Sequence, residues 1–471
     1  MNTPLYNKLL NYRNEKIPFH MPGHKFGKAA DLSKLNLSYL DNTEVKGLDN
    51  LYAAEAIIKE ASRLMADFYG AKETIFLTNG STAGILASIL AVCNPGDKIL
   101  VARNSHHSVW SALIHAGAIP IYINPKYEAE EDLLGEVALQ DIQAAIERYP
   151  DIKAAIIVSP TYEGIVSDIE SIANYLHKKD KILIVDEAHG AHFILGEKFP
   201  ISSIRKGADL VINSLHKTLP TLTQSALLHI CSDRVSYSKV ITVLRMIQTS
   251  SPSYMLMGII DYMRGYLIEH KEEIDKGYIE ELISMRGDLK KLSHLKLIEF
   301  YLERYDRSKI IISTRGTNID GYQLADWLDQ KYNIVVEAAL STYVILMTTL
   351  ADDKQTLGLL KESLFEIDGS LVKSPIITTN NDFLGMNIVE GMSPRDVFYA
   401  DKEWCQLGSC EGKKIARHIM LYPPGVPIIC LGETINFRNI MYIEKLQDKL
   451  QGIKKENKVL YLEVLKVKEN I

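Results

Sequence analysis

The chain has 471 residues, 46% of them hydrophobic, which is enough to bury a large core spread over about two or three domains. Its formal net charge of -6, with both signs interspersed, argues against nucleic acid or another polyanion as a partner. No apolar signal core opens the chain, and no segment approaches the ~20 apolar residues of a membrane span. The five cysteines are scattered without zinc-site spacing. We expect a soluble cytoplasmic protein with free thiols and with no metal, nucleic acid or membrane partner.

Strand and helix patterns alternate between about residue 74 and residue 231. Short Ile, Val and Leu runs bounded by Gly, Pro, Asn or Asp are typical of strands buried on both faces. The alternation predicts an α/β fold with a mainly parallel sheet and helices on both faces. The expected strands are Thr74–Thr78, Lys98–Ala102, Ile119–Ile123, Ala154–Ser159, Lys181–Val185, Asp209–Asn213 and Ala226–Ile230, and the helices between them include Ser81–Val92, Leu139–Glu147 and Asp168–Lys178.

The rest of the chain predicts further units. Residues 255–294 have Met, Leu and Tyr at helical spacing, which indicates long helices. Polar residues and glycine in Asn380–Gly391 suggest a hinge before a third unit. We expect an N-terminal arm over 1–30, a large domain over 31–294, a small α+β domain over 295–379 and a C-terminal domain over 380–471. The small domain alternates the strands Lys309–Ser313, Ile334–Glu337 and Tyr343–Met347 with the helices Gly321–Gln330 and Asp352–Phe365.

Lys217 is the most informative residue of the chain. It follows an apolar strand, and the hydroxyl of Ser214 and the imidazole of His216 lie close to it in sequence. A lysine amine forms a Schiff base with an aldehyde, while such neighbours reach an anion beside it. Asp186 ends an earlier buried strand, and an acid there can hold a pyridinium nitrogen protonated. Together they predict pyridoxal 5'-phosphate (PLP) as the cofactor, bound by the large domain.

A phosphate seat is expected at Gly80, Ser81 and Thr82, which follow a strand and open a helix. Glycine lets a ligand approach the backbone closely, and the first turn of a helix offers free N–H groups to an anion. Taken alone, the pattern fits an ordinary helix cap better than a phosphate site. Because PLP carries a phosphate, we interpret it as the phosphate site.

Several histidines have roles that the sequence leaves open. His106 and His107 follow another strand, where an imidazole can stack over a pyridine ring and exchange protons near neutral pH. His189 can hydrogen-bond Asp186, contact the substrate or serve as a structural histidine. The turn His20–Lys25 is either a surface loop or an arm that reaches the active site of a partner subunit.

Together these blocks resemble the Orn/Lys/Arg decarboxylase family, the bacterial basic amino acid decarboxylases of PLP fold type I. The resemblance runs along nearly the whole chain and is to the shorter form of the family, without the N-terminal wing domain. It implies a PLP-dependent transferase-like fold, with the last unit as a C-terminal decarboxylase-type domain. It is carried by Phe19–Lys25, Asn79–Thr82, Arg103–His106, Asp186–Gly190, Ser214–Lys217, Met392–Arg395, Tyr422–Pro427 and Gly432–Glu433.

The resemblance also implies residue roles. Lys217 would carry the cofactor as an internal aldimine, Asp186 would pair with the ring nitrogen, and His106 would stack over the ring. With His189 these residues form the expected catalytic set. The implied reaction is decarboxylation of lysine, arginine or ornithine to a diamine or agmatine, in a homodimer or higher homo-oligomer with shared active sites. The cofactor-binding set is Gly80, Ser81, Thr82, His106, Asp186, His189, Ser214, His216 and Lys217.

Some positions depart from the family pattern. Tyr52 and His107 replace a usual histidine and lysine, and Arg417 stands where an acidic or amide residue is usual. An added cation near a site for a cationic substrate would repel it, so the identity of the amino acid stays open. An aminotransferase or aldolase of the same fold, gripping a carboxylate with Arg315 or Arg395, is one alternative. A catalytically weak PLP-binding paralogue is another.

Overall fold

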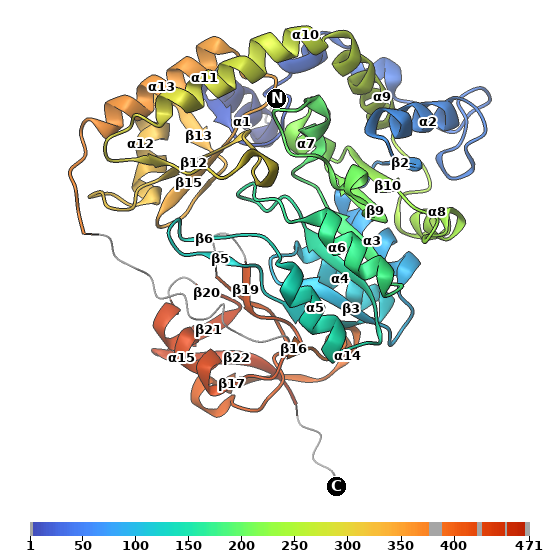
Figure 1. The fold of residues 1–471 in the computed structure, drawn as a ribbon, viewed down its shortest axis with the longest axis vertical. Coiled ribbons are helices and arrows are strands. Elements are labelled where there is room, and N and C mark those ends of the chain that lie inside the picture. Colours follow the sequence, from blue (N-terminus) through green and yellow to red (C-terminus); the bar gives the residue numbers. More distant parts are fainter. Residues whose placement is uncertain (1–2, 376–388, 422–425, 448–449, 467–471) are drawn as a thin grey trace.

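A large sheet organises the molecule (Figure 1). The computed structural model describes residues 3–375, 389–421, 426–447 and 450–466. Within them, eight strands are ordered β16-β4-β3-β7-β8-β9-β10-β2. The strands from β4 to β9 are parallel, whereas β10 and β16 run antiparallel to their neighbours. Their bounds are β2 Glu73–Leu77, β3 Lys98–Ala102, β4 Ile119–Ile123, β7 Ile152–Val158, β8 Ile182–Asp186, β9 Leu210–Asn213, β10 Ala226–Ile230 and β16 Val389–Glu390.

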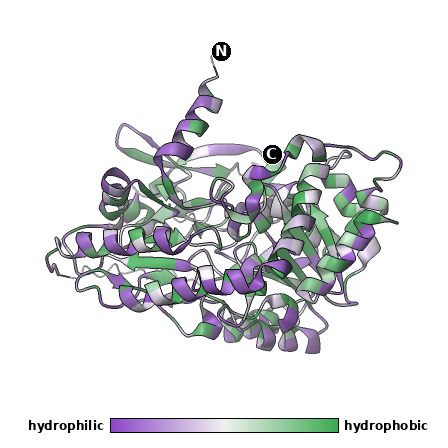
Figure 2. Ribbon diagram, turned by 90° about the horizontal axis from the view of Figure 1, so that it is seen from above, coloured by the Kyte–Doolittle hydropathy of each residue, from purple (hydrophilic) through white to green (hydrophobic). Residues whose placement is uncertain are grey.

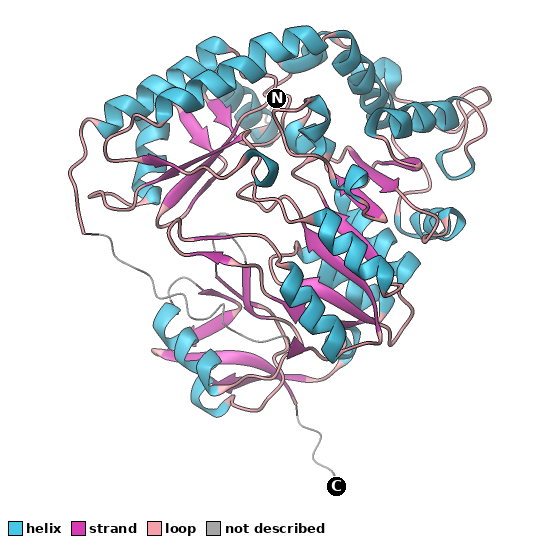
Figure 3. Ribbon diagram, viewed as in Figure 1, coloured by secondary structure: helices cyan, strands magenta, loops and turns pink. Residues whose placement is uncertain are grey.

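Helices cover both faces of this sheet (Figure 3). Successive strand residues enter opposite cores: Val185 packs with residues of α5 and α6, whereas Ile184 packs with residues of α3, α4 and α8. Burial on both faces is the reason that the strands appear in the sequence as unbroken apolar runs. The predicted fold class is therefore confirmed. The helices are α3 Gly80–Val92, α4 His107–Ala116, α5 Leu139–Arg148, α6 Ile169–Lys178 and α8 Tyr237–Ile247.

Part of the segment predicted to be a hinge, residues 380–391, forms a strand. Residues 380–388 lie outside the described residues, but Val389–Glu390 forms β16 and pairs with Tyr122 and Ile121 of β4. A two-residue strand has no periodic pattern that would separate it from a loop. The large sheet therefore gains an edge strand from far along the chain.

A smaller unit follows α9 (Tyr254–Glu269) and α11 (Glu280–Leu289). Its sheet is ordered β11-β12-β15-β14 and is antiparallel. The core that lines one face of the large sheet continues into it through Ile310 and Ile312. The N-terminal strand β1 pairs in parallel with β13 beside it. The bounds are β1 Ile17–Phe19, β11 Lys296–Leu297, β12 Lys309–Ser313, β13 Ile334–Val336, β14 Ala338–Ala339, β15 Tyr343–Met347, α12 Gly321–Tyr332 and α13 Lys354–Asp368.

The C-terminal unit has its own core, formed by two small sheets and α15. A buried ion pair between Arg103 and Glu433 attaches it to the large unit. Tyr422–Gly425 of the predicted tail motif lie outside the described residues. The elements are α14 Pro394–Tyr399, β17 Lys402–Gln406, β18 Ile419–Leu421, β19 Val426–Ile429, α15 Phe437–Leu446, β20 Leu450–Gln451, β21 Ile453–Glu456 and β22 Val459–Leu465.

The first helix, α1 (Pro4–Glu15), stands away from the rest of the chain (Figure 2). It buries none of its residues, and Leu5, Tyr6 and Leu9 are exposed. Among the helices that the structure describes, none has the length and apolar character needed to cross a membrane.

Candidate active site

Lys217 and Asp186 lie at the carboxyl ends of neighbouring parallel strands. Asp186 is the last residue of β8, and Lys217 follows β9 in the short helix α7 (Leu215–Thr218). Ligands of open α/β sheets bind at this edge of the sheet. The lysine side chain is half-buried, and its Nζ lies 3.0 Å from Nε2 of His189. Burial lowers the pKa of Lys217, and the carboxylates of Asp186 and Glu337 partly offset that effect.

Asp186 is a buried carboxylate with few partners. It is 4% exposed and accepts a hydrogen bond from the Ala188 amide at 3.1 Å. No described residue forms a direct ion pair with it. Burial raises its pKa, and the charge of Lys217 acts in the opposite direction. A cation that bound beside this carboxylate would stabilise its charged form.

His189 contacts two lysines. Its Nε2 faces Lys217, and its Nδ1 lies 3.1 Å from Nζ of Lys309. Burial lowers its pKa first, and the charges of the two lysines lower it further. Of the roles that the sequence left open for His189, a hydrogen bond to Asp186 is not among the contacts that the structure gives its two ring nitrogens. The ring also packs edge-on against Tyr162, with centroids 5.3 Å apart.

One turn joins the start of α3 to the Lys217 loop. The Gln224 carbonyl accepts a hydrogen bond from the Gly80 amide at 2.9 Å, and the Ser225 carbonyl accepts one from His216 Nδ1 at 3.2 Å. The two predicted parts of the phosphate seat are therefore brought together. Gly80 has a φ of +71°, and a Cβ placed on it would meet nothing within 4 Å. The backbone is open to a ligand at this point.

Unpartnered polar groups surround the same turn. Ser81 is half-buried and Thr82 is exposed, and neither hydroxyl bonds to a described residue. Within the described part of the chain, Ser225 Oγ and Gln248 Nε2 are buried without a hydrogen-bond partner. Ser214 Oγ lies 3.3 Å from Nδ1 of His216. Buried polar groups are almost always hydrogen-bonded, so these groups indicate a place for a polar ligand.

His106 caps the start of α4. Its Nδ1 accepts a hydrogen bond from the Ser108 amide at 3.3 Å, which leaves the ring proton on Nε2. Burial, together with the smaller effects of the charges of His107 and Lys217, lowers the pKa of His106 to about 4. His106 is therefore neutral at pH 7 and lies within the electrostatic reach of Lys217. The His107 ring packs against it with centroids 3.9 Å apart.

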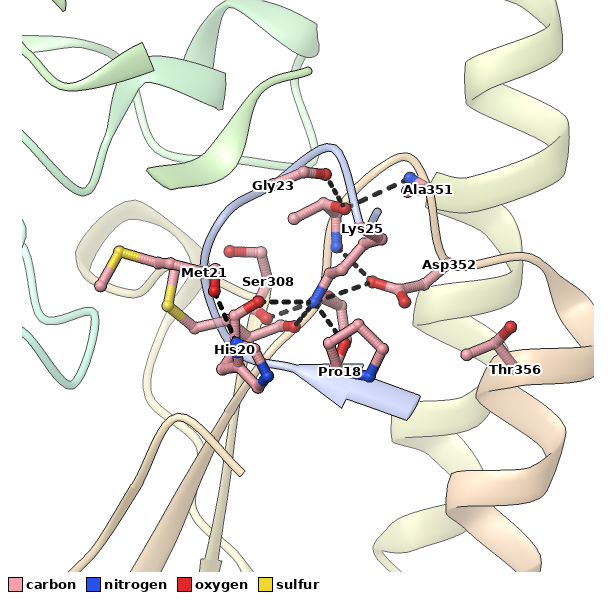
Figure 4. A network of polar contacts seen from close by, with 12 residues as sticks. Pro18, His20, Met21, Gly23, Lys25, Ser308, Ala351, Asp352 and Thr356 are labelled. Carbon is pink, nitrogen blue, oxygen red and sulfur yellow. Dashed lines mark hydrogen bonds and ion pairs between the residues drawn. The ribbon is translucent and has the colours of Figure 1, made fainter. Parts of the chain in front are cut away.

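The N-terminal motif Phe19–Lys25 is anchored by a buried lysine (Figure 4). Lys25 is 2% exposed, and its Nζ donates to the carbonyls of Pro18 at 2.7 Å and Met347 at 2.9 Å. A third carbonyl, that of His20, lies at 3.2 Å, and the Asp352 carboxylate at 3.7 Å. The turn is therefore fixed to the small unit of its own chain.

The same turn packs against the Lys217 loop. The Gly23 amide donates to the His216 carbonyl at 2.8 Å, and the Gly23 carbonyl accepts from Thr349 at 2.8 Å. A Cβ at position 23 would lie 2.9 Å from the Leu219 carbonyl oxygen. Only glycine fits this approach without a backbone shift. The motif thus connects the small unit to the loop that carries Lys217.

Two residues near Lys217, namely Lys309 and Glu337, lie outside the sequence motifs. Lys309 opens β12, and Glu337 follows β13. Glu337 accepts hydrogen bonds from the Tyr162 hydroxyl and the Met21 amide, both at 2.9 Å. The sequence held one usable signal, namely a lysine at the head of an otherwise apolar predicted strand. Fully buried lysines are rare unless they are paired or functional.

The residues that depart from the family pattern, and the two arginines that could grip a carboxylate, bind other groups of the chain. Arg417 lies on the C-terminal unit, where it donates to Glu463 at 2.8 Å and covers a tryptophan ring. The Tyr52 hydroxyl donates to the Thr249 carbonyl at 2.7 Å. Arg315 donates to the backbone carbonyls of residues 129 and 130, and Arg395 to those of residues 114 and 115. Both arginines are therefore held by backbone carbonyls of their own chain.

Comparisons with known proteins identify the family of the chain. The family model for the major domain of Orn/Lys/Arg decarboxylases matches residues 3–309. Arginine decarboxylase of Bacillus subtilis is 33% identical over 459 residues, covering 95% of this chain and 94% of that protein. The uncharacterized protein YaaO of the same species is 35% identical and covers 98% and 99%. The structure of constitutive lysine decarboxylase from Escherichia coli superposes with a TM-score of 0.78 at 19% identity, covering 98% of this chain and 82% of that one. The chain belongs to the Orn/Lys/Arg decarboxylase family.

Proposed function

We propose that the chain decarboxylates a basic amino acid with PLP as its cofactor, and that Lys217 binds the cofactor's aldehyde. The observation that carries the proposal is the placement of the Lys217 amine beside a buried, unpaired Asp186 at the carboxyl edge of the sheet. Relatives named arginine decarboxylase make arginine the first substrate to test, followed by lysine and ornithine.

The residues present fit PLP. Asp186 lacks a direct ion-pair partner among the described residues, so it can neutralise a protonated ring nitrogen. The open backbone at Gly80 and the free hydroxyls of Ser81 and Thr82 would hold the phosphate, with Ser214 and His216 on the adjoining loop. When bound, PLP would supply an electron-accepting ring that stabilises the carbanion left by loss of CO₂.

The protein's own groups would control the protons and the solvent around the reacting bond. His106 is neutral and holds its ring proton on Nε2, so it can donate a hydrogen bond without adding positive charge. Burial around Asp186 and His189 limits water in the site, and a poorly solvated carboxylate loses CO₂ more readily. Lys217 would return as a free amine when substrate replaces it.

No observation favours the alternative reactions. An aminotransferase would use an arginine to grip the substrate carboxylate, but Arg315 and Arg395 are engaged with backbone carbonyls. Within one chain Arg417 forms an ion pair with Glu463, so its charge is neutralised there and does not support the expected repulsion of a cationic substrate. A second catalytic function is therefore not proposed.

The test combines spectroscopy with product analysis. We expect purified protein with PLP to absorb near ~420 nm, the band of the lysine-bound cofactor, and to release CO₂ from arginine, lysine or ornithine. Lys217→Ala should lose both signals, whereas replacing the exposed Lys46 with alanine should change neither. Bound PLP without CO₂ release from any of the three amino acids would refute the proposed activity.

The proposed assembly is a homodimer or larger homo-oligomer with shared active sites. Support comes from α1, whose Leu5, Tyr6 and Leu9 side chains are exposed and are not covered by any described part of the chain. Light scattering of the full chain should give at least twice the monomer mass. A strictly monomeric, active protein would contradict this part of the proposal.

A further inference from the structure

Two lysines contact the same buried imidazole. Lys217 Nζ lies 3.0 Å from Nε2 of His189, and Lys309 Nζ lies 3.1 Å from Nδ1 of the same ring. Lys309 is 0% exposed, and its side chain packs tightly against Gly164, where a Cβ would come within 2.9 Å of Lys309 Cγ. The position of Lys309 beside His189 is therefore fixed by its packing.

The chemistry of these groups limits their protonation states. A lysine ammonium carries three donors and no acceptor, and a neutral imidazole has one donor nitrogen and one acceptor nitrogen. His189 is buried between two amines that lower its pKa, so it is neutral. It can accept a hydrogen bond from one ammonium, and its other nitrogen must then donate. The second lysine can pair with that N–H only as a neutral amine.

The surroundings decide which lysine keeps its charge. Lys309 lies near three carboxylates, Asp306, Glu337 and Glu163, which raise its pKa, whereas burial and Lys217 lower it to about 8. Lys309 is therefore mostly an ammonium at pH 7 and occupies Nδ1 of His189. The imidazole proton then sits on Nε2 and points at Lys217. The titratable groups that face the three residues are Asp186 and Glu337 at Lys217, His106 and His192 at His189, and Asp306, Glu163 and Glu337 at Lys309.

We propose that Lys309 is a positioning residue that, through His189, holds the amine of Lys217 in its neutral form. A neutral amine is the form that condenses with an aldehyde: nitrogen forms a C=N bond to the aldehyde carbon, and the carbonyl oxygen leaves as water with the two amine hydrogens. Lys309 thus prepares Lys217 to capture its cofactor at neutral pH. The inference rests on the proposed function and adds a residue that the motifs do not contain.

Replacing Lys309 tests the link. In Lys309→Met, Nδ1 of His189 becomes free to carry the ring proton, so Nε2 can accept from a Lys217 ammonium. The charged form of Lys217 is then stabilised, and the pH at half-maximal capture should rise by about one unit, which corresponds to about tenfold slower capture at pH 7. The readout is the rate at which full-length apo protein develops absorbance near ~420 nm with added PLP, followed across pH.

A second variant shows whether His189 transmits the effect. His189→Phe removes both hydrogen bonds, so it should also raise the half-maximal pH. In that background Lys309→Met should change the capture rate by less than about twofold. If Lys309→Met does not fold, as judged by circular dichroism, Lys309→Leu, which also removes the amine, takes its place.

The outcomes separate the two proposals. Wild-type protein that develops no absorbance near ~420 nm overturns the proposed function itself. Wild-type capture with an unchanged pH profile in Lys309→Met overturns the role of Lys309. If Lys309→Met shifts the half-maximal pH equally in the wild-type and His189→Phe backgrounds, the proposed role is also overturned, because the charge of Lys309 would then act directly on Lys217.

Discussion

Lys25→Met should loosen the turn that supports the Lys217 loop. The substitution keeps an unbranched apolar side chain of similar length and removes the ammonium. It leaves three carbonyl oxygens, those of Pro18, His20 and Met347, without this donor (Figure 4). It also leaves the carboxylate of Asp352, 2% exposed, with the Thr349 amide at 2.8 Å as its remaining hydrogen-bond donor.

The size of the effect follows from the buried charge. Removing one partner of a buried ion pair costs about 3–5 kcal/mol, most of it from the charge left behind. We therefore expect Lys25→Met to lower the free energy of opening of the turn by about 4 kcal/mol. Burial raises the pKa of Asp352, and Lys25 is the largest of the influences that lower it. Without Lys25 its folded pKa rises further above the unfolded value, so the loss of stability should be greater at pH 8 than at pH 5.

Hydrogen exchange measures this opening locally and does not require two-state unfolding of the whole chain. Peptides that cover residues 15–30 and 343–352 should exchange about a thousand times faster in Lys25→Met. Adding Asp352→Asn removes the stranded charge and should restore about half of the lost free energy. A change of less than tenfold in the single variant, or no recovery in the double variant, would show that the ammonium does not hold the turn.

Further substitutions probe other contacts. Gly23→Ala places a methyl group 2.9 Å from the Leu219 carbonyl oxygen. The free energy of unfolding should fall by about 1–3 kcal/mol, which lowers the melting temperature, and PLP capture should be slower. Arg395→Ala removes hydrogen bonds to the end of α4, so the melting temperature should fall while KM for the amino acid stays unchanged; a raised KM would restore the carboxylate-grip reading. Burial lowers the pKa of His229 to about 3. Between pH 6.5 and 3 the unfolded chain therefore binds more protons at this residue than the folded chain, and the free energy of unfolding decreases as the pH is lowered. Urea unfolding should show a loss of about 1.4 kcal/mol from this group by pH 5.5, absent in His229→Gln.

The sequence was sufficient where burial alone shapes the pattern. The strand Lys98–Ala102 has the predicted bounds because both of its faces are buried and polar residues flank it. The order of strands in the sheet has no such local signal. β16 shows this clearly, since Val389–Glu390 pairs with a strand more than two hundred residues earlier in the chain, and its position depends on tertiary packing.

Site residues within local motifs were predictable from the sequence, whereas those brought in by tertiary packing were not. Lys217 and Asp186 were predictable because each stands at a strand end within a local motif. The second partner of His189 was not, because Lys309 lies 120 residues further along and comes from the small unit. The sequence left the partners of His189 open, and packing of the small unit supplies Lys309 as one of them. Contacts between units are the information that local patterns lack.

The three buried or half-buried lysines show how partners, rather than burial, determine reactivity. Burial lowers the pKa of Lys25, Lys309 and Lys217 alike. Lys25 faces only acceptors, namely carbonyls and a carboxylate, so its lone pair is never available. Lys309 faces the acceptor nitrogen of His189 and three nearby carboxylates. Lys217 faces the remaining nitrogen, which must donate, and a lysine that faces a donor is neutral. The reactive amine of Lys217 is therefore defined by its hydrogen bond with His189, and the direction of that bond is set by Lys309 on the other side of the ring.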